Sequence, residues 1–408
     1  MNSIQIQARK NLNIPLNHHI IISLDGGGMR GILTIQLLKK LEEVAGAPIY
    51  QWCNMVAGTS TGAIIAGLIL KEKTAAEIED LYKKMVSRVF TKRNLLASRF
   101  FNPPAFDKVN YRNILKQTVG DVTLQQCSAK TGLDVMITAK DTEAGEETFF
   151  TCFNHNGLNN GADFKGTYQS VLLRGVMEAT MSAPTYFLPF ERFVDGGTTT
   201  YNNPVQAAVL EAVVYDGANK YKIDELTVLS FGTGTIHKIF EPEEVANPGG
   251  LDVKFWLNYV MDETSRDASE MQINTLRSGL LNGLSLRRFQ LSLDKDTLNL
   301  LPNKDISDLA DLEADTLHDL SDEVLSKIDM ADVSKFGLME RIGQAFADEI
   351  CPDAEKKLSI TERQANWFAY DLVKINSARG KYVKAFGNKE EILNNLSNPA
   401  WIDSQSSK

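Results

Sequence analysis

One serine of this chain lies in a sequence pattern that is typical of a nucleophile. Residues 58–62 read Gly-Thr-Ser-Thr-Gly, a G-x-S-x-G pattern centred on Ser60. Such a serine stands on a sharp turn between a strand and a helix, where the glycines let neighbouring backbone approach and leave Oγ exposed. The N-terminus of the helix also stabilises developing negative charge. The alternative interpretation is a turn of small residues that closes a strand and does no chemistry.

A second pattern, at residues 25–31, is a glycine-rich loop that could bind an anion. It reads Asp-Gly-Gly-Gly-Met-Arg-Gly and follows an apolar run at residues 19–24. Its backbone N–H groups could hold the pyrophosphate of a dinucleotide or the oxyanion of an acyl-transfer intermediate. A dinucleotide site needs an acidic residue at the end of the next strand, and the segment that leads to the serine has none. We therefore expect an oxyanion hole with N–H groups from Gly27 and Gly28, and with Thr61 as a further candidate donor.

A third pattern places a carboxylate on a turn. Residues 195–197 read Asp-Gly-Gly, and an aspartate flanked by glycines can lie against neighbouring backbone. Asp-Gly is also common in ordinary loops. Taken alone, the pattern favours such a loop.

The order of the three patterns, D-G-G-G-x-R-G, G-x-S-x-G and then D-G-G, resembles the patatin-like phospholipase family. The segment Ala179–Phe187, which reads ATMSAPTYF, is similar to a further family motif that precedes the aspartate. Residues 202–204, Asn-Asn-Pro, resemble the N-x-P that opens the next helix. The resemblance covers about residues 19–210, or half of the chain.

The resemblance implies a serine–aspartate dyad. Ser60 would attack an ester carbonyl, Asp195 would accept its proton and orient it, and water would then hydrolyse the acyl-enzyme. Serine needs an adjacent base, which need not be histidine. An aspartate is a weak base unless a poorly solvated site raises its pKa. The other positions that the resemblance assigns are Gly26, Gly27 and Gly28 for the oxyanion, Arg30 as the basic residue of that loop, and Gly58, Gly62, Gly196 and Gly197 in support of the turns.

A Ser-His-Asp triad is the alternative mechanism. In the order Ser, acid, His, only His237 and His318 follow the aspartate. His237 comes shortly after an expected strand, so it is the candidate for a third member. The chain has only five His, and the dyad needs none of them.

Strands and helices alternate along the chain, which indicates an α/β fold with a largely parallel sheet. Together with the resemblance, this predicts three layers, α/β/α, and a mainly helical C-terminal extension. Apolar runs predict strands at residues 19–24, 54–59, 133–139, 147–153 and 226–231. Apolar periodicity predicts helices after the two glycine-rich turns and at residues 75–90, 109–119, 168–181, 203–215, 253–281 and 361–377.

The chain is expected to comprise a lead-in at residues 1–18, a catalytic domain at residues 19–300 and the extension at residues 301–408. Within the extension, residues 305–332 contain ten Asp or Glu and one Lys, with apolar residues at helical spacing. This composition predicts a helical segment with a solvated acidic face. It does not match an EF-hand, because no glycine lies at the turn position.

Residues 83–101 reverse the sign of the charge. They contain six Lys or Arg and no acid, interleaved with apolar residues, in a chain of net charge −9. The pattern is typical of a segment at a membrane interface, and a core helix followed by a solvated loop is the alternative. A further hypothesis is autoinhibition, in which the acidic segment covers the basic one. The residues expected at the membrane are Lys92, Arg93, Leu95, Leu96, Phe100 and Phe101.

Composition limits the function classes. With 43 Lys plus Arg against 52 Asp plus Glu, the chain is not a typical nucleic-acid binder. Its four dispersed Cys predict neither a disulfide framework nor a zinc site. We expect a cytoplasmic protein that associates transiently with a membrane surface, because the sequence shows no secretory signal and no apolar run long enough to span a bilayer.

The patterns and the resemblance together predict a lipid acyl hydrolase of the phospholipase A or lysophospholipase type, with no metal and no organic cofactor. Three alternatives stay open. They are a regulated effector phospholipase whose C-terminal region senses a ligand, a non-lipid esterase or acyltransferase, and a dinucleotide-binding oxidoreductase.

Overall fold

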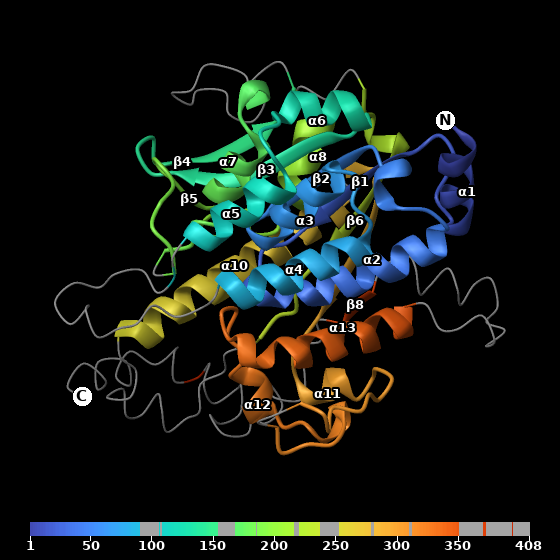
Figure 1. The fold of residues 1–408 in the computed structure, drawn as a ribbon. Coiled ribbons are helices and arrows are strands. Elements are labelled where there is room, and N and C mark those ends of the chain that lie inside the picture. Colours follow the sequence, from blue (N-terminus) through green and yellow to red (C-terminus); the bar gives the residue numbers. More distant parts are fainter. Residues whose placement is uncertain are drawn as a thin grey trace.

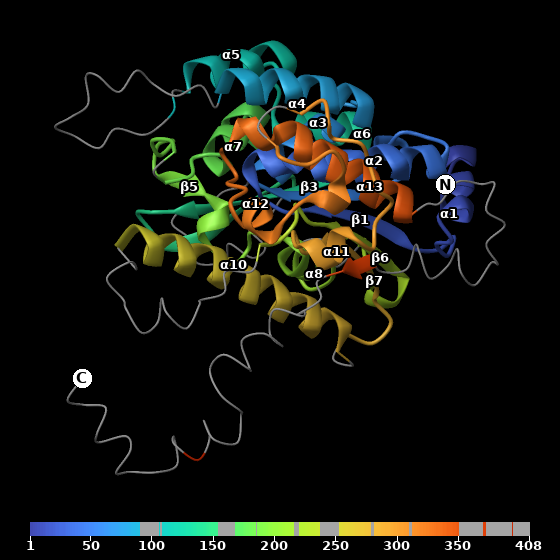
Figure 2. The same cartoon turned by 90° about the horizontal axis from the view of Figure 1, so that it is seen from below.

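The computed structural model describes residues 1–89, 106, 108–153, 168–184, 186–215, 220–236, 253–278, 281–309, 312–350, 370–372 and 394. Figure 1 shows a central sheet covered by helices, and Figure 2 shows the same layers from below. Among the described residues, no helix combines the length and the apolar composition that crossing a bilayer requires.

The sheet runs in the order β4-β3-β2-β1-β6-β7-β8, and β5 pairs with β3 away from this path. Neighbours on the path are parallel, except that β3 is antiparallel to β4; β5 is also antiparallel to β3. The carboxyl ends of the parallel strands therefore meet at one edge, where open α/β sheets bind their ligands. The strands are β1 (His19–Leu24), β2 (Met55–Thr59), β3 (Asp134–Asp141), β4 (Glu146–Thr151), β5 (Phe193–Asp195), β6 (Leu226–Phe231), β7 (Ser285–Leu291) and β8 (Tyr370–Leu372).

Helices cover both faces of the sheet (Figures 1 and 2). One face packs against α2 to α7 and α13, and the other against α8 and α10. The helices are α1 (Ser3–Asn11), α2 (Gly31–Ala45), α3 (Thr61–Leu70), α4 (Ala75–Val89), α5 (Val109–Thr118), α6 (Leu124–Thr131), α7 (Leu173–Thr180), α8 (Val205–Val213), α10 (Val253–Arg277), α11 (Lys295–Leu298), α12 (Asp322–Ser326) and α13 (Phe336–Ile350).

The apolar run at β1 is buried on both faces of the sheet. Ile20 and Ile22 pack in the core on the α2 side, whereas Ile21 packs in the core on the α8 side. This follows from the period of two along a strand. All ten residues of α3 are likewise buried, which explains why its sequence is apolar all round.

The three-layer α/β/α fold predicted from the sequence is confirmed, and the five predicted strands are present within one or two residues of their expected bounds. The short β5 and the Arg-containing β7 were not expected. The helix expected at residues 361–377 is wrong where the structure describes that range, because Tyr370–Leu372 extend the sheet as β8 beside β7. β8 pairs with the edge of β7, and the sequence does not reveal that β7 has a free edge there.

The helical prediction for residues 305–332 is also wrong for most of the described part. That segment contains one short α-helix, α12, and is otherwise turns and a 3₁₀ turn. The physical reason is local: carboxylates and hydroxyls bind nearby N–H groups, as Asp305 does at Ser307 and Asp332 at Ser334, and so compete with helix formation. The apolar side chains of the segment nevertheless enter the core.

Residues beyond 300 pack into the same apolar core as α2 and α3. Leu317, Leu325 and Phe346 belong to the cluster formed by α2 and α3. Figure 1 shows α13 lying alongside α2. The division of the chain at residue 300 remains a prediction.

Candidate active site

Ser60 lies at the turn between β2 and α3. Its backbone has φ 52° and ψ −121°, a conformation that L-residues rarely adopt. The turn is held by a 2.8 Å bond from the Ser60 N–H to Thr180 Oγ1. A Cβ at Gly62 would collide with the backbone of Leu24 at the end of β1, so only glycine lets α3 begin here. The side chain stays close to the surface of a cavity, with the residue 8% exposed.

Asp195 lies next to the serine, as the resemblance implies. Ser60 Oγ donates a 2.6 Å hydrogen bond to Asp195 Oδ2. Asp195 ends β5, and its backbone is opposite Ala139 of β3, which fixes the carboxylate over the edge of the sheet. The other carboxylate oxygen accepts the Gly197 N–H at 2.7 Å. The aspartate is therefore held by the turn that follows it and points one oxygen at the serine.

The protonation of Asp195 is set by its surroundings. Burial raises the pKa of this carboxyl to about 6, against the opposing effects of the Ser60 hydroxyl, the Gly197 N–H and the Lys108 ammonium. A carboxylate with a pKa near 6 is a stronger base than an exposed aspartate and is still ionised at neutral pH. The structure thus supplies the shift that an aspartate base requires.

The glycine-rich loop lies beside the serine, and its N–H groups differ. The Gly26 N–H already donates to Asn202 O at 3.0 Å. Among the described residues, the N–H groups of Gly27 and Gly28 have no acceptor. Thr61 N–H, at the first turn of α3, is likewise left open by helix geometry. Gly27, Gly28 and Thr61 therefore keep N–H groups that could meet an oxyanion, whereas the Gly26 N–H is already bonded within the protein.

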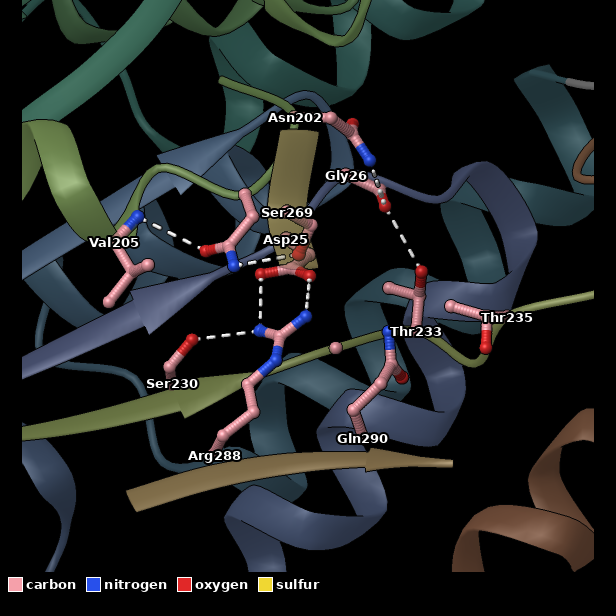
Figure 3. Close-up of polar contacts among 12 residues, drawn as sticks. Asp25, Gly26, Asn202, Val205, Ser230, Thr233, Thr235, Ser269, Arg288 and Gln290 are labelled. Atoms are coloured by element: carbon pink, nitrogen blue, oxygen red, sulfur yellow. Dashed lines mark hydrogen bonds and ion pairs between the residues drawn. The ribbon is translucent and has the colours of Figure 1, made fainter. Parts of the chain in front are cut away.

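Two carbonyls of the loop are anchored from outside it. The Gly28 carbonyl accepts hydrogen bonds from Thr61 Oγ1 at 2.9 Å and from the Tyr82 hydroxyl. The Gly26 carbonyl accepts from Thr233 Oγ1 at 3.0 Å and, more weakly, from Asn202 (Figure 3). These contacts fix the direction of the neighbouring N–H groups.

A buried ion pair supports the start of the loop. Arg288, on β7, binds both oxygens of Asp25, with Nη1 to Oδ1 at 2.8 Å, and it also binds Ser230 Oγ at 2.8 Å (Figure 3). Sequence analysis missed Arg288, because no local pattern joins it to a residue 263 positions earlier. The only available signal is a pair of arginines inside the otherwise strand-like segment 285–291.

A cavity of about 510 Å³ extends from the dyad. Its walls include Gly26 to Gly28, one side of α10, the last residue of α12 and residues 327–331 of the loop that follows. Met330 O accepts the Met29 N–H at 2.7 Å, so this C-terminal loop is bonded to the oxyanion loop. Gly28 has φ +56°, and a Cβ there would collide with the Met330 carbonyl.

Arg30 also lines this cavity. Burial lowers the pKa of its guanidinium, while the charges of Asp262, Asp329 and Tyr186 act in the opposite direction. Its Nε has no hydrogen-bond partner among the described residues. Arg30 thus brings a cation to the cavity wall.

The structure brings together most of the predicted site. Gly58 and Gly62 flank the serine turn, and Gly196 and Gly197 form the turn after Asp195. His237 and the expected membrane residues, Lys92 to Phe101, lie outside the described residues. No group of His, Cys, Asp or Glu in the described part of the chain is arranged to hold a metal ion.

Comparisons with known proteins identify a family that this chain resembles. Residues 22–209 match the family model described as patatin-like phospholipase. The chain is 30% identical over 232 residues to the mouse 85/88 kDa calcium-independent phospholipase A2, a match that covers 53% of this chain and 27% of the mouse protein. It is 26% identical over 289 residues to an Escherichia coli cUMP-AMP-activated phospholipase, covering 67% of this chain and 82% of that protein.

Among solved structures, VipD from Legionella pneumophila is similar at 9% identity and a TM-score of 0.35, covering 82% of this chain and 66% of that one. The chain matches 27%, 29% and 42% of the length of three mammalian relatives, which is less than half of each.

Proposed function

We propose that this chain, whose residues 22–209 are a patatin-like phospholipase domain, hydrolyses carboxylic ester bonds of phospholipids or lysophospholipids through an acyl-enzyme on Ser60. The observation that carries the proposal is the 2.6 Å bond between Ser60 Oγ and Asp195 Oδ2, next to two open glycine N–H groups. The names of the relatives support a phospholipid as the substrate class.

In the proposed mechanism, each step of acyl transfer has a group near Ser60 that could carry it. As Ser60 Oγ attacks the ester carbonyl, its proton passes to Asp195 and the carbonyl oxygen becomes negative beside the N–H groups of Gly27 and Gly28. The tetrahedral intermediate then collapses, the C–O bond to the leaving alcohol breaks, and Asp195 returns the proton to that alcohol. Water repeats the sequence on the acyl-enzyme, with Asp195 again as the base, and releases a fatty acid.

The decisive test is hydrolysis of phospholipid vesicles followed by mass spectrometry of the products. We expect the wild type to release fatty acid and the Ser60→Ala variant to release none. Ser87→Ala, on the exposed face of α4, is the matched control and should behave as the wild type. Undiminished release by a folded Ser60→Ala variant would exclude the acyl-enzyme, and adding an alcohol acceptor would show acyl transfer as a new ester product.

The oxidoreductase alternative is disfavoured by the hydrogen bonds that the loop already makes. The N–H groups of Gly26 and Met29 donate to Asn202 O and Met330 O, so they are not available to a pyrophosphate. A bound nicotinamide would be seen as a change in absorbance or fluorescence on adding the cofactor. We expect no such change.

A second candidate is a phospholipase whose activity depends on its C-terminal part. The bond between Met29 and Met330 favours it, because any movement of the loop after α12 would displace the oxyanion loop. The Escherichia coli relative is named for activation by cUMP-AMP. Hydrolysis measured with and without this dinucleotide tests the idea: a rise supports gating by such a ligand, and an unchanged, already high rate opposes it.

A further inference from the structure

Lys108 is a buried cation with no role in the mechanism above. It precedes α5, and its side chain is 7% exposed. Burying an ammonium group is costly unless charges compensate it. The N-terminus of a helix also disfavours a positive charge. A lysine in this place therefore needs a compensating reason.

The nearest partners of Lys108 offset the cost of burial only in part, because burial still lowers its pKa to about 8 against the effect of Glu178. Its Nζ lies 2.6 Å from Ser182 Oγ, which is a neutral group, and 3.8 Å from Glu178 Oε1. That carboxylate is already bound by Arg112, with Nη2 at 2.6 Å and Nε at 2.7 Å. The ring of Phe190 lies 5.7 Å away and offers only a weaker attraction.

Ser182 connects Lys108 to the dyad. While its hydroxyl contacts Lys108 and donates to Glu178 O at 2.8 Å, its backbone carbonyl accepts the Asp195 N–H at 3.1 Å. The charges also act through space, since the ammonium lowers the pKa of Asp195 and the carboxylate raises the pKa of Lys108. Lys108 is thus coupled to Asp195 through one shared residue and through the electrostatic field.

We propose that Lys108 is a positioning residue whose charge keeps Asp195 ionised and whose contact with Ser182 keeps it aligned with Ser60. The inference rests on the proposed function, because it assigns a role in the same reaction. It adds a third ionisable group to the serine–aspartate pair without placing that group in contact with the substrate.

The arrangement defines a pH window. Burial lowers the pKa of Lys108 to about 8, against the effects of Glu178 and Asp195 and in the same direction as Arg112. Asp195 is a base above about pH 6, and Lys108 is a cation below about pH 8. The remaining neighbour, Tyr111, stays neutral in this range because burial raises the pKa of its hydroxyl well above the usual value.

The rate at which a fluorophosphonate labels Ser60, measured against pH, tests the proposal without any lipid. Lys108→Met removes the charge and the contact, Lys108→Gln removes the charge but keeps a donor for Ser182, and Lys108→Arg keeps both. In the wild type the labelling rate should fall at low pH as Asp195 is protonated, and we call this fall the acid limb. In the two neutral variants we expect the acid limb to move to higher pH by about one unit, as for loss of a nearby opposite charge. The arginine variant should keep the limb of the wild type.

Arg112→Met is the matched control, because it removes a cation from the same helix and the same glutamate. It should leave the acid limb in place, and thermal melting confirms that each variant is folded. If folded Lys108→Gln and Lys108→Met keep the wild-type limb, the inference is wrong and Lys108 only fills space. If the wild type itself is not labelled, the acyl-enzyme proposal fails instead.

Discussion

Two buried aspartates lie at the carboxyl edge of the sheet, and their carboxylates have different partners. Asp25 and Asp195 are each 4% exposed, and burial raises the pKa of both. Arg288 binds both oxygens of Asp25 directly. Asp195 instead contacts a hydroxyl and one N–H, and the Lys108 ammonium donates to Ser182. A direct ion pair thus neutralises one carboxylate, whereas the other is left without such a pair and is the one that we propose as the base.

The largest expected effect on the rate of hydrolysis comes from neutralising Asp195. Asp195→Asn should lower the rate of hydrolysis about 10³- to 10⁴-fold, as loss of a catalytic carboxylate does elsewhere. It should also raise the free energy of unfolding at pH 8, by up to about 3 kcal/mol, because the shift from 3.8 to about 6 disfavours the ionised folded state. Steady-state kinetics and urea unfolding measure both quantities. If Asp195→Asn lowered both the rate of hydrolysis and the free energy of unfolding, Asp195 would stabilise the fold as Asp25 does, and the contrast between the two aspartates would be wrong.

Removing Arg288, the partner of Asp25, should lower the stability of the fold. Arg288→Met leaves Asp25 buried without compensation and should lower the free energy of unfolding by about 3–5 kcal/mol. Adding Asp25→Asn to it should recover a large part of this loss. Arg341→Met is the control, since its ion pair with Asp308 is exposed and is worth about 1 kcal/mol or less. If Arg288→Met and Arg341→Met lowered the free energy of unfolding equally, the buried pair of Arg288 with Asp25 would be no more important than an exposed one.

The oxyanion loop between the two aspartates should be sensitive to one methyl group. Gly28→Ala introduces a Cβ at φ +56° against the Met330 carbonyl, so we expect hydrolysis to slow about 10²-fold, as for a displaced oxyanion donor. Gly145→Ala is the matched control, because Gly145 also has positive φ, at +72°, but has open space around it. That variant should lose stability and keep its activity.

The pH dependence of the rate tests whether Asp195 is the base. Protonation of Asp195 removes the base, so the rate should fall about tenfold per pH unit below about pH 6 and level off above it. The fold should persist through this range if Asp25 remains paired. Circular dichroism alongside the kinetics checks that the loss is chemical, and a rate that is flat from pH 4.5 to 7 would show that Asp195 is not the base.

The smallest effect is expected at histidine. His237→Ala should keep most of the activity, because the dyad needs no imidazole. The cavity that holds the dyad has no histidine among its described lining residues. Loss of hydrolysis in a folded His237→Ala protein would replace the dyad by a triad.

Local patterns predicted the parts of the site that are local. The turn at Ser60, the glycines that precede α2 and the turn at Asp195 each follow from a short stretch of sequence, and the structure places them together. Arg288, Lys108 and Met330 were not found, because each acts on a residue far away in the sequence and carries no motif of its own. Their roles depend on strand order and on burial, which periodicity does not encode.

The same reason explains the errors in the C-terminal part. Apolar spacing in residues 305–332 correctly marks side chains that are buried, but it does not reveal that carboxylates cap the intervening turns. Three residues at 370–372 become a strand only because β7 offers an edge.

The contact between Met330 and the glycine-rich loop has a consequence for how this chain can be divided. The stretch that matches the family model ends at residue 209, yet Arg288 and Met330 complete the support of that loop from beyond it. A fragment cut at the family boundary, or that boundary used to graft the domain onto another protein, would carry the nucleophile without its full scaffold. A fragment that keeps these contacts must extend beyond residue 330, and α13 packs into the same core. Residues 210–350 therefore belong in any fragment that is to hold Ser60 and Asp195 as they lie here.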